Sequence, residues 1–188
     1  MLGMKGPVGI VLVSLCMFGC GRSELELKED SSQTVETERS SGISWLAGDH
    51  HVHSRFSVTY DKESDPPVPA LGGEGRYAIP MNVAMGRRFG LDWIVTTDHG
   101  GPGHSKINLE DAYPELLDSR EAIPEMIQFM GMEFDTPGAD HSSLIMPFGS
   151  NESEDLYGIE SRFNKAEPWP ADPSWDSEER MIEALDWM

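Results

Sequence analysis

Residues 91–97 form the segment that most constrains the fold. They read Leu-Asp-Trp-Ile-Val-Thr-Thr, so nearly every side chain is apolar or β-branched. Such a run predicts a strand buried on both faces, as in a parallel sheet. Further strands are expected over residues 44–53, 127–135 and 142–146, with helices over residues 80–89, 114–121 and 176–188. This alternation of strands and helices predicts an α/β fold with parallel strands.

A His-x-His pair lies near the end of the first expected strand. Alternate side chains of a strand share a face, so His51 and His53 point the same way. Two imidazoles spaced in this way can converge on one metal ion about 2.0–2.1 Å from each nitrogen. His50 points to the opposite face and is not expected to be a ligand. On its own, the pair fits a polar strand end equally well.

Three later groups strengthen the metal interpretation. Asp98 and His99 follow the strand at 91–97, where parallel α/β proteins place their active sites. Glu133 lies inside an apolar strand, and a carboxylate there is costly unless it is paired or bound to a cation. His141 follows after a short turn. A carboxylate can bridge two ions, so Glu133 is the natural bridge between His51 with His53 on one side and His141 on the other.

These motifs resemble those of the PHP (polymerase and histidinol phosphatase) domain family over roughly residues 45–147. The family has His-x-His, Thr-Asp-His, Gly-x-Glu and a further His, here at residues 51–53, 97–99, 131–133 and 141. The resemblance implies a distorted (β/α)7 barrel and a hydrolase, most commonly a phosphoesterase. It also implies that His99 helps to hold a third ion. The two or three divalent ions would be Zn, Mn or Fe.

The expected mechanism follows from that cluster. Two ions about 3.5–4 Å apart produce a bridging hydroxide near neutral pH and polarise the oxygen under attack. Asp98 is expected to orient His99 or a water molecule, and Arg55 to reach a substrate anion. Asp98 and His99 are therefore the predicted catalytic residues.

The family's later ligands have no counterpart in the sequence. No histidine follows His141, and Val58 and Thr59 stand where the family often has another ligand. The chain therefore resembles the N-terminal portion of a barrel over residues 44–188. We expect it to bind metal but to hydrolyse p-nitrophenyl phosphate barely above background. The alternatives are a non-catalytic metal- or ligand-binding lipoprotein on a degenerate barrel, a carbamate or amide hydrolase of the same family, and an amidohydrolase, which the motifs fit poorly.

The N-terminal segment predicts export. Residues 8–18 form an apolar run too short to span a bilayer, and residues 17–20 resemble a lipobox ending at Cys20. We expect a signal peptide over residues 1–19, an acylated Cys20, and a disordered tether to residue 43. This predicts a lipid anchor in the bacterial envelope, with the outer membrane facing the periplasm favoured. An ordinary signal peptide is the alternative.

Composition limits the partners and the local structure. A net charge of −19 argues against a nucleic-acid partner and would also repel a phosphate-bearing substrate at long range. The small phosphoester or related substrate expected as the partner is what the family resemblance implies. Six Pro and Gly residues within residues 61–75 predict no regular element there. His104 is expected to lie at the surface, and residues 151–172 to have little order. Met81, Met85 and Phe89 are expected to form the apolar stripe of the helix at residues 80–89.

Overall fold

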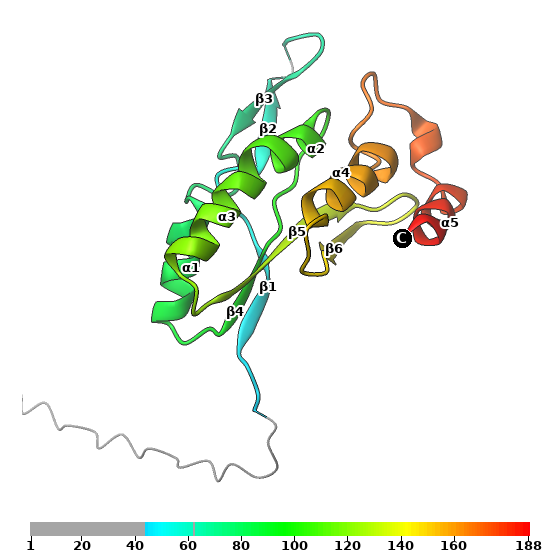
Figure 1. Ribbon diagram of the computed structural model, residues 1–188. Helices are drawn as coiled ribbons and strands as arrows, with labels where there is room; N and C mark the ends of the chain where they lie inside the picture. Colours follow the sequence, from blue (N-terminus) through cyan, green and yellow to red (C-terminus); the bar gives the residue numbers. More distant parts are fainter. Residues whose placement is uncertain (1–43, 62) are drawn as a thin grey trace, which may run out of the picture. The chain divides into compact units, whose positions relative to one another are not determined.

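The central feature of the fold is a curled sheet of four strands. The computed structural model describes residues 44–61 and 63–188. Strands β1 (Gly48–Val52), β4 (Trp93–Thr96), β5 (Ile127–Asp135) and β6 (His141–Ile145) are adjacent in that order (Figure 1). The first three are parallel and β6 is antiparallel to β5. The mixed α/β prediction is confirmed as a mostly parallel half-barrel, but the expectation of parallel strands is wrong for β6, because a short turn joins it to β5.

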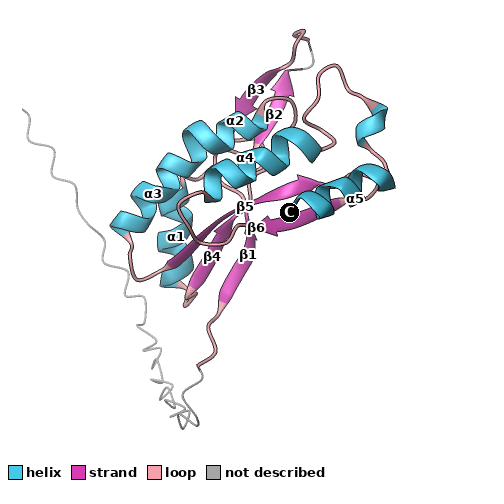
Figure 2. Ribbon diagram, turned by 45° about the vertical axis from the view of Figure 1, so that its right-hand side comes forward, coloured by secondary structure: helices cyan, strands magenta, loops and turns pink. Residues whose placement is uncertain are grey.

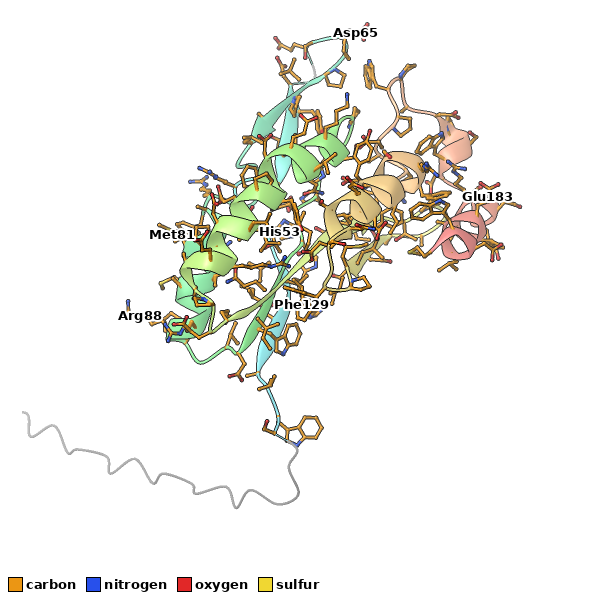
Figure 3. The ribbon with its side chains drawn as sticks, viewed as in Figure 1. His53, Asp65, Met81, Arg88, Phe129 and Glu183 are labelled. Atoms are coloured by element: carbon orange, nitrogen blue, oxygen red, sulfur yellow. The ribbon has the colours of Figure 1, made fainter. Side chains whose placement is uncertain are left out.

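The two faces of β5 separate the core from the site. Met130, Met132 and Phe134 are buried in the hydrophobic core that the helices cover. Phe129 and Glu133 occupy the alternate positions, so their side chains point to the other face. His53 lies nearer than Phe129 to the carboxyl ends of the parallel strands (Figure 3). The strand boundaries match the expected range of 127–135, since a long apolar run with period two is a local signal.

Helices α1 (Ile79–Arg88), α3 (Tyr113–Ala122) and α4 (Glu152–Phe163) pack against one face of the sheet (Figures 1 and 2). The helix expected at residues 80–89 is present, but its apolar stripe of Met81, Met85 and Phe89 is not the face that meets the core. Met81 is 52% exposed and lies on the outer side of α1, whereas Ile79 and Val83 are buried (Figure 3). Helix periodicity alone could not decide which of two apolar faces meets the core.

Strands β2 (Val58–Asp61) and β3 (Val68–Leu71) form an antiparallel hairpin that projects beyond the end of the sheet (Figures 1 and 2). The expectation of no regular element in residues 61–75 is therefore wrong. Pro69 is tolerated because both strands of a two-stranded hairpin are edge strands. Its backbone nitrogen, which has no hydrogen to donate, can face away from the neighbouring strand. After β3, the amides of Gly72 and Gly73 donate to the Ser57 carbonyl at 3.1 and 3.0 Å.

The sequence also predicts a loop over residues 102–108, but the structure is helical from residue 104 onward. Helix α2 (His104–Ile107) continues through a π-helical turn (Asn108–Ala112) into α3. His104 is fully buried, so the expectation of a surface histidine is wrong. Its Nδ1 lies 2.5 Å from Oε1 of the buried Glu160 on α4, and this pairing compensates the loss of solvent.

The C-terminal part of the chain is more ordered than expected. Helix α4 occupies a region where little order was predicted, and a short 3-10 helix (Pro173–Trp175) precedes α5 (Glu178–Trp187). Ser177 caps α5 by accepting from the amide of Arg180 at 3.2 Å. No helix within the described residues has the length and apolar character needed to cross a bilayer. The predicted signal peptide, Cys20 and tether lie outside the described residues.

Candidate metal centre

The candidate site forms where the parallel strands β1 and β4 end. His53 follows β1 directly, and Asp98 and His99 follow β4 after Thr97. The Thr97 amide donates to the Val52 carbonyl at 2.9 Å, which extends the pairing of the two strands to this point. The carboxyl ends of parallel strands are the usual position of active sites in such sheets.

His51, His53 and Glu133 bring three ligand atoms to one point. The two Nε2 atoms lie 2.9 Å apart. Glu133 Oε2 lies 3.6 Å from His51 Nε2 and 3.2 Å from His53 Nε2. Ligand atoms around a tetrahedral transition metal ion are about 3.3 Å apart, given metal–ligand bonds of about 2.0–2.1 Å. The three side chains therefore fit one ion, with His51 and His53 directed to the same side and Glu133 reaching them from β5.

The environment of His53 favours the neutral ring that a metal requires. Burial lowers the pKa of His53, and the neighbouring His99 lowers it further. Only a neutral imidazole has a free lone pair for coordination. Because the pKa of His53 is lowered, fewer of its rings must release a proton when a metal ion binds near neutral pH. His50, in contrast, is exposed, as expected for the residue that faces away.

A second group joins His53 and His99 to Glu74. The ligand atoms of these three residues all lie within 4.8 Å of one another. Glu74 Oε2 is 3.1 Å from His99 Nε2. Gly75 allows this approach, because a Cβ atom at that position would lie 2.1 Å from the Ser54 carbonyl oxygen. Sequence reasoning missed Glu74, although a glutamate between glycines in a loop was the available signal.

His141 lies on the far side of Glu133 from the histidine pair. Its Nδ1 is 3.1 Å from Glu133 Oε1, and its Nε2 is 3.1 Å from Asp135 Oδ1. Glu133 thus presents one oxygen to each side, as a bridging carboxylate must. Asp135 was not predicted, because only the antiparallel pairing of β5 with β6 places it opposite His141. Burial raises the pKa of Asp135, and the adjacent His141 opposes that rise.

Asp98 is fully buried, and its described hydrogen bonds do not include His99. Oδ1 accepts from the Ser54 amide at 2.6 Å and from Ser57 Oγ at 2.7 Å. Oδ2 accepts from Ser54 Oγ at 2.5 Å. The expected orientation of His99 by Asp98 therefore has no direct contact to support it, and the expected orientation of a water molecule stays a prediction. The Asp98 carboxylate holds the turn after β1.

Arg55 is exposed, and its guanidinium pairs with Glu115 on α3. The other oxygen of Glu115 accepts from the Ile79 amide at the start of α1, at 2.8 Å. The structure thus gives Arg55 a partner in the protein, and its contact with a substrate anion stays a prediction. Cys20, the predicted lipidation site, lies outside the described residues.

Imidazole and carboxylate are the donor types that Zn, Mn and Fe accept, so these residues fit a transition metal ion. The two groups share His53, and a single imidazole nitrogen serves only one ion at a time. If His53 binds with His51 and Glu133, the second group retains Glu74 and His99. No family model, curated protein or solved structure matches the chain.

Proposed function

We propose that the chain is a metal-dependent hydrolase of the PHP type, acting on phosphoesters. The observation that carries the proposal is the convergence of His51 Nε2, His53 Nε2 and Glu133 Oε2 within 3.6 Å of one another. This convergence lies at the carboxyl ends of parallel strands, where such chemistry is usually found. The half-barrel sheet is compatible with the first part of a PHP-type barrel.

The residues of the site have distinct roles in this proposal. A bound transition metal ion supplies Lewis acidity, lowering the pKa of water and polarising the oxygen under attack. His51 and His53 fix the position of the ion, and Glu133 spans the distance to His141. Glu74 and His99 provide two ligands for a further ion beside the first.

A non-catalytic metal-binding protein is the second candidate. His141 is about half exposed, and both of its nitrogens already contact carboxylates. A second ion would therefore depend on few protein ligands, while catalysis requires ions in a fixed geometry with an open position. Hydrolysis of carbamates or amides by the same site is a variant of the first proposal.

Metal content tests the site itself. The wild-type chain is compared with His51→Ala/His53→Ala and with His50→Ala after incubation with Zn or Mn and desalting. We expect metal in the wild type and in His50→Ala, since His50 is exposed, and none in the double variant. Equal metal content in all three proteins would disprove the assignment of His51 and His53 as ligands.

Turnover tests the catalytic part of the proposal. The metal-loaded wild type and Glu133→Gln are assayed with p-nitrophenyl phosphate and with a p-nitrophenyl carbamate. We expect a slow, metal-dependent release of nitrophenol from the phosphoester that Glu133→Gln abolishes. Stoichiometric metal binding with no turnover on either substrate would support the non-catalytic alternative.

The proposed location is the bacterial cell envelope, through a lipid on Cys20. The motif at residues 17–20 and the apolar run before it support this proposal. Palmitate labelling of the full-length chain should depend on Cys20 and be lost in Cys20→Ala. Recovery of the unlabelled wild-type chain in the cytoplasm would contradict it.

A further inference from the structure

Each histidine of the first group has a serine hydroxyl on its second ring nitrogen. His53 Nδ1 lies 3.0 Å from Ser57 Oγ, and His51 Nδ1 lies 2.8 Å from Ser143 Oγ. These contacts leave both Nε2 atoms facing the proposed ion. A hydroxyl can donate or accept, so the serine alone does not decide which ring nitrogen carries the proton.

The partner of Ser57 decides the direction of its hydrogen bond. Ser57 Oγ lies 2.7 Å from Oδ1 of Asp98, and both side chains are fully buried. A carboxylate only accepts hydrogen bonds, so the single hydroxyl proton of Ser57 points to Asp98. The lone pair of Ser57 then accepts from His53 Nδ1–H. In that tautomer, the Nε2 of His53 has no proton and is free to coordinate.

We propose that Asp98 acts through Ser57 as a positioning residue that holds His53 in the Nδ1–H tautomer. The proposal deepens the proposed metal site, because it assumes that Nε2 of His53 is the coordinating atom. It gives Asp98 a role different from the one expected from the sequence. Ser143 is exposed and has no described carboxylate partner, so His51 is held less firmly than His53.

Ser54 provides a matched control. Ser54 and Ser57 are both fully buried, and both donate to Asp98. Only Ser57 contacts a ring nitrogen of His53. If Asp98 merely closes the turn after β1, removal of either hydroxyl should have the same effect on metal binding. If Asp98 selects the tautomer, removal of the Ser57 hydroxyl should have the larger effect.

The first measurement needs no variant. Long-range 1H–15N spectra of the metal-free, 15N-labelled wild-type chain at about pH 8, where imidazoles are neutral, report which nitrogen of His53 carries the proton. We expect Nδ1–H, although free histidine in water favours Nε2–H. Observation of Nε2–H in His53 would overturn the proposal, whether or not the chain is a hydrolase.

The second measurement compares zinc dissociation constants by competition with a chromophoric chelator. We expect Ser57→Ala to bind zinc about 10–100-fold more weakly than wild type, the usual effect of losing a partner of a metal-binding histidine. Ser54→Ala should bind zinc as wild type does, even if it is less stable. Equal losses in the two variants, or no loss in Ser57→Ala, would show that the contacts are only structural. If Ser57→Ala does not fold, the wild-type spectrum still decides the proposal.

Discussion

Gly131 lies two residues before Glu133, and its replacement by alanine tests how closely β6 approaches β5. A Cβ atom at Gly131 would lie 2.3 Å from the Leu144 carbonyl oxygen and 2.7 Å from Val95 Cγ1. The carbonyl belongs to the backbone of β6, so it cannot rotate away as a flexible side chain can. Gly131→Ala must therefore push β6 outward or distort β5.

The expected cost follows from these two contacts. Overpacking a buried site typically costs about 1–3 kcal/mol. Displacement of β6 also weakens a hydrogen bond of the antiparallel pair, worth about 1 kcal/mol. We therefore expect the free energy of unfolding to fall by about 3 kcal/mol, which corresponds to a decrease in Tm of roughly 6–12 °C for a folded unit of this size.

Thermal and urea unfolding of metal-free protein, followed by circular dichroism, measure this loss. Gly149→Ala is the control, since an added Cβ atom would lie 4.0 Å from the Pro147 carbonyl oxygen, an ordinary contact distance. The control should remain within about 0.5 kcal/mol of wild type, as surface substitutions usually do. If Gly131→Ala unfolds at the same temperature as the control, the close pairing of β5 and β6 is wrong.

Two further predictions concern buried charges. Burial, together with the nearby Glu160, raises the pKa of Glu167 to about 7. The stability contributed by protonated Glu167 is therefore complete below pH 4.5 and is lost as the pH rises through 7. Glu167→Gln should therefore flatten the decline in urea midpoint across this range, and an unchanged pH profile would contradict the buried position of Glu167. Arg120→Ala should cost about 3–5 kcal/mol in urea unfolding, because it leaves the carboxylate of Glu152, only 1% exposed, without its ion pair. Arg87→Ala breaks an exposed pair and should cost less than about 1 kcal/mol, so similar losses in the two variants would refute the argument.

Local periodicity accounts for the parts of the fold that the sequence predicted well. The boundaries of β5 and the helices at α1 and α3 follow from runs of apolar residues and from proline at the helix starts. The common face of His51 and His53 follows from the alternation of side chains in a strand. These features depend on residues a few positions apart, so they can be predicted without knowledge of the tertiary fold.

Residues distant in sequence decided the features that were mispredicted or missed. His104 is buried because Glu160, 56 residues later, supplies a partner inside the core. Glu74 reaches His99 because β2 and β3 pair as a hairpin beyond the sheet. Neither contact has a local signature, since the cost of burying a polar group depends on which partner the fold brings to it.

The sequence by itself determined which residue types can bind a metal, and it indicated that His51 and Glu133 lie on strands with His53 at a strand end. Only the tertiary structure decided that their ligand atoms meet within 3.6 Å, that Asp135 faces His141, and that Asp98 contacts Ser57 instead of His99. The physical reason is that strand periodicity fixes the direction of a side chain, whereas strand order and register fix its neighbours. The direction of a side chain depends on residues next to it in the sequence, whereas its neighbours in space depend on the whole folded unit.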